Sequence, residues 1–147
     1  MRRTSCAARW WAARFLAQLV AARLGALFCH SERRQSNTAG TSAGDGGLYA
    51  ATYRLPEALA ARLPGLRVAV VDDVVNAGSA VRATLAALVH AAAQPVAFGA
   101  LLTLGTTPAT VAAAAGLPLE TLATRENQIW EPEQCPQCAS GEPLQTP

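Results

Sequence analysis

Residues 67–89 read RVAVVDDVVNAGSAVRATLAALV, and the fold prediction starts from this stretch. It opens with an apolar, β-branched run at residues 68–71, which is typical of a strand buried on both faces. Two carboxylates, Asp72 and Asp73, follow where that strand is expected to end. A turn of small residues at 76–80 comes next, and apolar residues then recur with helical spacing. The order of strand, acidic pair, glycine-containing turn and helix predicts a site for a phosphorylated sugar.

The residue types in this stretch suit a ribose 5-phosphate. Neighbouring carboxylates repel each other and are costly to bury alone, and the two hydroxyl groups of a ribose, with or without Mg²⁺, would supply partners. The turn places backbone N–H groups of residues 77–80 at the start of a helix, where unsatisfied donors and the helix dipole favour an anion. Gly78 allows close approach of the backbone, and the Ser79 hydroxyl adds a donor. Either half alone is common surface structure, but the combination in this order favours a binding site.

Composition sets the class of protein. With 147 residues, 51% of them hydrophobic and 15% charged, the chain can form one domain with a substantial core and is unlike a disordered protein. The net charge of +2 and the lack of a basic stripe argue against a nucleic-acid partner. No apolar run is long enough to span a bilayer, so no membrane association is expected. The few, unevenly spaced cysteines do not form a disulfide scaffold, which predicts a reduced, cytoplasmic setting.

Strands and helices alternate over residues 1–124, which predicts one domain with an open, mostly parallel α/β sheet and flanking helices. Residues 1–30 contain arginines and no acidic residue, so an organelle transit peptide or a secretory signal is the alternative to a core helix there. Residues 31–47 are polar and rich in Gly, Ser and Thr, which predicts a mobile loop of the kind that closes over a site. The chain is expected to break at Gln94-Pro95. Helices are expected at residues 12–24, from Val81 onward, and at 108–115, where Thr107 is the N-cap. A short helix or turn is expected in the segment that ends at Pro64-Gly65. Strands are expected at residues 26–29, 48–55, 68–71, 96–103 and 117–123.

Residues 125–147 form a tail rich in Pro and Glu that contains Cys135 and Cys138 in a CPQC sequence. One CxxC supplies two of the four ligands that a structural zinc site needs. A redox pair is expected at a helix N-terminus after a strand, not in a Pro-rich tail. The tail therefore favours a structural or incidental pair, with half of a shared metal site and a redox pair as alternatives.

The sequence VVDDVVNAGSAVR at residues 70–82 resembles the phosphoribosyl-diphosphate motif of type I phosphoribosyltransferases. The order of residues in this motif is most similar to that of orotate phosphoribosyltransferases. The helix FLAQLVAARLG, the basic SERR stretch, the loop and the YRLP sequence precede the motif in the same order, so the resemblance extends over residues 13–102. The IWxPxxCPxC pattern of the tail is similar to that of a subgroup of orotate phosphoribosyltransferase-like bacterial proteins.

This resemblance implies a Rossmann-like core and a pentosyl transfer in pyrimidine nucleotide biosynthesis. Ribose 5-phosphate would pass from phosphoribosyl diphosphate to a pyrimidine base, orotate giving orotidine 5′-phosphate, with release of pyrophosphate. Mg²⁺ would be bound through the diphosphate. A basic loop residue closes over the diphosphate, often from the neighbouring subunit, which implies a homodimer. Asp72, Asp73 and Arg33 would be the catalytic residues, the carboxylates stabilising positive charge on the ribose. The implied substrate-binding residues are Asp72, Asp73, Val74, Val75, Asn76, Ala77, Gly78, Ser79, Ala80 and Arg34.

Three departures from the family pattern bear on this reading. The family places a strand and a glycine-containing diphosphate loop before the first helix, whereas residues 6–13 read CAARWWAA, which implies a shortened or altered N-terminal part. Orotate enzymes carry an arginine after the strand that follows the motif, whereas residues 104–107 read LGTT. Asn76 stands where a threonine is usual. The alternatives are therefore a catalytically impaired ribose-phosphate-binding or regulatory remnant, or a phosphoribosyltransferase for another nucleobase.

Overall fold

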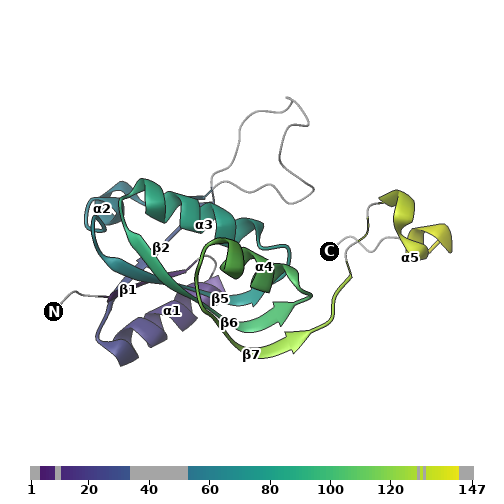
Figure 1. The fold of residues 1–147 in the computed structure, drawn as a ribbon, viewed down its shortest axis with the longest axis horizontal. Helices are drawn as coiled ribbons and strands as arrows, with labels where there is room; N and C mark the ends of the chain where they lie inside the picture. Colours follow the sequence, from purple (N-terminus) through teal and green to yellow (C-terminus); the bar gives the residue numbers. More distant parts are fainter. Residues whose placement is uncertain (1–3, 9–10, 34–52, 129, 131, 143–147) are drawn as a thin grey trace.

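The core of the protein is a five-stranded sheet in the order β2-β1-β5-β6-β7. The computed structural model describes residues 4–8, 11–33, 53–128, 130 and 132–142. Each neighbouring pair in the sheet is parallel, and helices α1 and α3 cover opposite faces (Figure 1). The predicted open, mostly parallel sheet with flanking helices is therefore confirmed. The bounds of these elements are β1 Thr4–Ala8, α1 Trp11–Leu24, β2 Leu27–His30, β5 Arg67–Val75, α3 Ser79–His90, β6 Gln94–Leu104 and β7 Leu119–Arg125.

Strand β5, in the middle of the sheet, continues through the acidic pair. The sequence predicted that the strand ends before Asp72 and Asp73, and this boundary is wrong. Asp72 pairs with Ala100, and the ladder with β6 continues until Val75 pairs with Thr103. Backbone pairing with the long neighbouring strand therefore carries the extended conformation past two residues that, by themselves, disfavour a strand.

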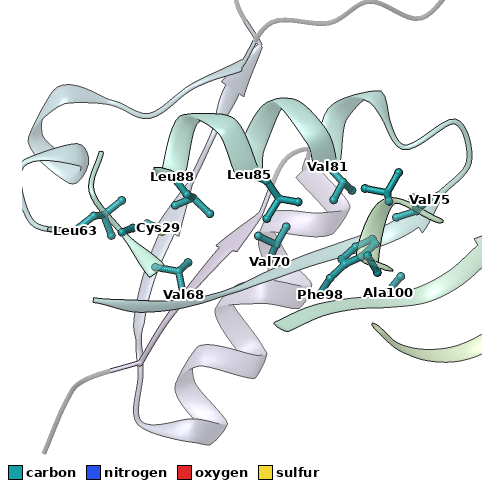
Figure 2. Packing of buried hydrophobic residues seen from close by; sticks show 13 residues of the cluster. Cys29, Leu63, Val68, Val70, Val75, Val81, Leu85, Leu88, Phe98 and Ala100 are labelled. Atoms are coloured by element: carbon teal, nitrogen blue, oxygen red, sulfur yellow. The ribbon is translucent and has the colours of Figure 1, made fainter. Parts of the chain in front are cut away.

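Two apolar layers hold the helices to the sheet. On one face, Val68 and Val70 of β5 lie beneath Leu85 and Leu88 of α3, with Phe98 of β6 in the same cluster (Figure 2). On the other face, α1 packs alanines against Val71 of β5. Small side chains let the helix approach the sheet closely. The predicted core helix at residues 12–24 is confirmed, and it ends at Leu24 just before Gly25, whose φ is +60°.

Strand β1 lies between β2 and β5, and the sequence analysis did not predict it. Its residues TSCAA show neither an apolar run nor a clear alternation. It is a strand because its backbone pairs on both sides, Ser5 with both Leu27 and Val68. The connection from β1 to α1 at residues 9–10 is where the resemblance places the diphosphate loop, and it lies outside the described residues.

The first three residues of the predicted loop at 31–47 are part of the folded domain. Ser31 is buried, and β3 (Glu32–Arg33) pairs antiparallel with β4 (Tyr53–Arg54). The two segments that flank the loop are therefore held side by side. Residues 34–47 of the predicted loop, and 48–52 of the predicted returning strand, lie outside the described residues.

The remaining predicted elements differ from the structure mainly in their ends. Pro95 lies inside β6 and does not break the chain, because it pairs with Val68 at a register irregularity, where the missing N–H of proline is tolerated. Thr106, not Thr107, is the N-cap residue of α4 (Thr107–Ala114). The short segment before residues 64–65 is α2 (Glu57–Ala60), and the tail contains η1 (Pro132–Gln134) and α5 (Pro136–Ala139). In the described part of the chain, every helix is too short or too polar to cross a bilayer.

Candidate functional site

A cavity of about 230 Å³ lies where β5 ends and α3 begins. It brings together Asp72, the last two residues of β5 and the whole predicted turn at residues 76–80. The first turn of α3 extends the lining to Val81, which the sequence analysis treated only as a helix residue. The cavity opens at the carboxyl end of a central parallel strand, the place where open α/β sheets bind their ligands.

The start of α3 equips this cavity for an anion. The helix begins at Ser79, and the N–H groups of its first turn have no partner within the helix. These donors lie at the positive end of the helix dipole, and the turn that precedes them lines the same cavity. A phosphate group is therefore the ligand chemistry that this end of the cavity favours.

Gly78 shapes the turn for two reasons. Its φ is +70°, a left-handed conformation that side chains rarely adopt. A Cβ at this position would also lie 2.9 Å from Cγ2 of Val111, on α4. Glycine is thus required both by the backbone conformation and by the close approach of α4, a packing role that the sequence did not indicate.

Arg82 holds the turn from inside α3. Its Nη2 donates a hydrogen bond of 2.8 Å to the carbonyl oxygen of Ala77. The guanidinium thus restrains the carbonyl of Ala77, and it adds positive charge beside the turn. Arg82 ends the motif that carries the family resemblance, but the sequence analysis assigned it no role.

The two aspartates occupy different positions. The Asp72 side chain is only 3% exposed, lines the cavity and accepts a hydrogen bond of 3.1 Å from the N–H of Asp73. Asp73 is half-buried, and its side chain is on the opposite face of β5, since successive side chains of a strand alternate. Among the described residues, the cavity lining includes Asp72 but not Asp73. Asp72 is therefore the carboxylate placed beside the turn at residues 76–80.

A hydrogen bond from the last strand reaches the same turn. Nδ2 of Asn127, just after β7, donates to Oδ1 of Asn76 at 2.8 Å. The N–H of Gly105, just after β6, donates to the carbonyl oxygen of Arg125 at 2.8 Å. The segments that follow β5, β6 and β7 are thus tied together at one edge of the sheet. The sequence analysis missed Asn127, because nothing in its local sequence marks it.

Comparisons with known proteins agree with this geometry. No protein-family model matches the chain. The orotate phosphoribosyltransferase of Thermotoga maritima is 32% identical to it over 84 residues, which cover 57% of the chain and 43% of that relative. The chain thus spans less than half the length of this curated relative.

Solved structures match over most of the chain. Adenine phosphoribosyltransferase from Rhodothermus marinus has a TM-score of 0.67 and 21% identity, covering 84% of this chain and 70% of that one. The Trypanosoma brucei adenine enzyme, solved with AMP, pyrophosphate and ribose-5-phosphate, has a TM-score of 0.65 and 18% identity over 95% and 68% of the two chains. Orotate phosphoribosyltransferase from Aeropyrum pernix has a TM-score of 0.57 and 20% identity over 84% and 60%.

This chain has the type I phosphoribosyltransferase fold. The resemblance read from the motif is therefore confirmed at the level of the fold. Both adenine and orotate enzymes have this fold, so the fold does not select between the two bases.

The predicted basic residues of the type I phosphoribosyltransferase loop lie at the edge of what the structure describes. Arg33 is the second residue of β3, which places its backbone at the root of the loop. Arg34 lies outside the described residues. Their contact with a diphosphate stays a prediction.

The residues of the site fit a magnesium ion that arrives with its substrate. Carboxylate oxygens such as those of Asp72 are ligands that Mg²⁺ accepts, and the ion usually keeps waters and substrate phosphates as its other ligands. Within the described ranges, no three His, Cys, Asp or Glu side chains gather closely enough to hold a metal by themselves. The described chain thus offers one or two carboxylates, and a diphosphate would have to supply the remaining oxygens.

Proposed function

We propose that this chain is a phosphoribosyltransferase of the orotate-like type, which transfers ribose 5-phosphate from phosphoribosyl diphosphate to a nucleobase and releases pyrophosphate. The observation that carries the proposal is the cavity that joins a buried carboxylate, Asp72, to the phosphate-binding turn at the start of α3. The two chemical ends of a ribose 5-phosphate, its hydroxyl groups and its phosphate, find complementary groups there.

Each part of the site has a role in this proposal. The N–H groups of the turn bind the 5′-phosphate, and Arg82 holds the turn in position. Asp72 accepts hydrogen bonds from the ribose hydroxyls, and its negative charge stabilises the positive charge that develops on the ribose as the diphosphate leaves. Mg²⁺, held by the diphosphate and the carboxylate of Asp72, would supply positive charge to the leaving group. Arg33 or Arg34 closes over the diphosphate, in a homodimer that we expect in the cytoplasm.

Orotate is the first base to test. The curated relative is named as an orotate enzyme, which supports orotate as the base and pyrimidine nucleotide synthesis as the pathway in this proposal. Two observations favour another nucleobase as the alternative: residues 104–107 offer no arginine for the carboxylate of orotate, and several of the similar structures are named as adenine enzymes.

The test is pyrophosphate release by the full chain with phosphoribosyl diphosphate, Mg²⁺ and a panel of orotate, uracil and adenine. We expect release with one base of the panel. Asp72→Asn should lower kcat/KM by about tenfold or more, the size of effect seen when a charge-stabilising group is removed. Glu120→Gln, which removes an exposed carboxylate on β7, is the matched control and should have no effect.

A second candidate is a protein that binds ribose 5-phosphate without catalysing transfer. It is favoured by the CAARWWAA sequence at residues 6–13, which lacks the glycine of the diphosphate loop. In this case calorimetry detects ribose 5-phosphate binding that Asp72→Asn weakens, but no base gives pyrophosphate release. If ribose 5-phosphate does not bind at all, both candidates are wrong.

A further inference from the structure

The two cysteines of the tail lie together on one short turn. The Sγ of Cys135, the residue directly before α5, accepts a hydrogen bond of 3.4 Å from the N–H of Cys138. Both cysteines are reduced, Cys135 partly exposed and Cys138 exposed. The side chains of the two cysteines are also hydrogen-bonded to each other, so the two sulfurs lie close together on this turn. A disulfide forms when the Cβ atoms of such a pair approach to about 3.5–4.5 Å.

We propose that Cys135 and Cys138 form a redox-active dithiol, which exchanges with low-molecular-weight disulfides of the glutathione class. This site is separate from the proposed transferase site and does not depend on that function. The sequence favoured a structural or incidental pair, with a redox pair as one alternative. We choose the redox pair because the structure hydrogen-bonds the two cysteines to each other on one turn, although that turn follows η1 and not a strand.

The order of attack follows from the hydrogen bonds. The thiolate of Cys135 attacks one sulfur of the external disulfide, forms a mixed disulfide and releases one thiolate, which takes up a proton. The thiol of Cys138 then loses its proton and attacks the Sγ of Cys135, which displaces the second external thiol. Two electrons pass from the protein pair to the external disulfide, so the products are one internal disulfide and two thiols.

The surroundings of the two sulfurs differ in the direction that this order requires. Backbone and side-chain hydrogen bonds from Cys138, with a further backbone bond from Gln137, lower the pKa of the Cys135 thiol. The pKa of Cys138 is raised, mainly because its side chain is hydrogen-bonded to Cys135. The attacking thiolate is therefore stabilised at Cys135, while Cys138 stays protonated until the mixed disulfide forms.

The position of the pair makes it accessible to a partner of this size. In Figure 1, α5 stands apart from the sheet, at the far end of the segment that follows β7. By contrast, Cys29 lies in the core, where burial raises its pKa to about 11. In the tail as described, no third His, Cys, Asp or Glu side chain joins the pair as a metal ligand.

The test is a titration of the full chain with mixtures of oxidised and reduced glutathione, followed by mass-spectrometric mapping of each cysteine. We expect an internal disulfide between Cys135 and Cys138 in the wild-type chain. Cys138→Ser should stop at a mixed disulfide on Cys135. At pH 7, Cys135 should react with iodoacetamide faster than Cys138, because its thiolate is the one that the hydrogen bonds stabilise.

Two comparisons make the result decisive. Ser140→Ala, a neighbouring change that leaves both thiols in place, should behave as wild type, and Cys29 should stay unmodified. The proposal is overturned if no internal disulfide forms at any glutathione ratio, or if Cys138 reacts faster than Cys135. It is also overturned if the reduced chain binds Zn²⁺ through these cysteines in a dimer, because the pair is then half of a shared metal site.

Discussion

Asn127 and Asn76 are joined by a hydrogen bond of 2.8 Å, although they lie 51 residues apart. Asn76 is the first residue of the turn that we propose binds phosphate, and Asn127 follows the last strand of the sheet. The bond is exposed, so it contributes little to the stability of the fold, but it restrains the side of the turn that α3 does not hold. The segment after β7 thus supports the candidate site by restraining the position of Asn76.

We expect Asn127→Ala to weaken ribose 5-phosphate binding by about threefold to tenfold, the loss that one net hydrogen bond of about 1 kcal/mol implies. The midpoint of thermal unfolding should change little, because the bond is exposed. Isothermal titration calorimetry measures the first quantity and a melting curve the second. Gln128→Ala, the same truncation one residue further on, is the control. Equal affinities for the Asn127 variant and wild type would show that the bond does not restrain the turn.

Gly78→Ala should damage both stability and binding. The substitution strains a backbone at φ +70° and drives a methyl group to 2.9 Å from Val111, so we expect a loss of about 1–3 kcal/mol in the free energy of unfolding. Gly116→Ala is the matched control, because Gly116 has φ +64° but no atom near its missing Cβ. The difference between the two variants measures the contact with Val111. Urea denaturation of both variants, alone and combined with Val111→Ala, measures the free energies of unfolding for a double-mutant cycle. If the effects of Gly78→Ala and Val111→Ala simply add, the contact with Val111 is not the cause of the lost stability.

Local sequence was sufficient to predict the centre of the site. The apolar run of β5, the helical spacing in α3 and the glycine between them are each encoded within a few residues. These local signals are mutually consistent, so the turn is predicted in the right place, although its end is wrong: α3 begins at Ser79 and not at Val81. The prediction failed where the conformation depends on distant partners.

Three errors show this dependence. Strand β1 has no apolar pattern and exists because β2 and β5 pair with it. Asp72 and Asp73 are extended because β6 continues beside them. The bond of Asn127 to the turn requires the strand order β5-β6-β7, which local sequence patterns do not specify. A sequence read by itself lacks these long-range pairings.

Substitutions of Arg82 test whether its hydrogen bond to the carbonyl oxygen of Ala77 holds the turn in position. Arg82→Ala removes the 2.8 Å bond to Ala77 and a positive charge, so ribose 5-phosphate affinity should fall about fivefold to tenfold, as for the loss of a charged hydrogen bond at an exposed site. Arg62→Ala removes an exposed charge elsewhere and should leave the affinity unchanged. Arg82→Lys keeps the charge but not the guanidinium geometry. If it binds as wild type does, charge alone explains the effect.

Two buried hydroxyl groups join the residue after β2 to helix α3: Ser31 Oγ and Thr84 Oγ1 lie 3.1 Å apart. Thr84→Val leaves the Ser31 hydroxyl buried without this partner, so we expect a loss of about 1–3 kcal/mol in the free energy of unfolding. Adding Ser31→Ala should restore part of that loss, because neither hydroxyl of this pair then remains buried without its partner. Chemical denaturation of the two single variants and the double variant measures this. Strictly additive losses would contradict the idea that the hydroxyls satisfy each other.

We expect the buried thiol of Cys29 to make the protein less stable at high pH. Burial raises its pKa from 9.0 to about 11, so the unfolded chain loses this proton at a lower pH than the folded chain does. The contribution is therefore fully present below about pH 9 and is lost as the pH rises towards 11, with a total of about 2–3 kcal/mol. The sequence contains no lysine, so no lysine titration adds to the slope in this range. Urea unfolding between pH 8 and pH 11, in the presence of a reductant, measures the slope. Cys29→Ala should flatten the slope, and an unchanged slope in this variant would assign the loss to another group.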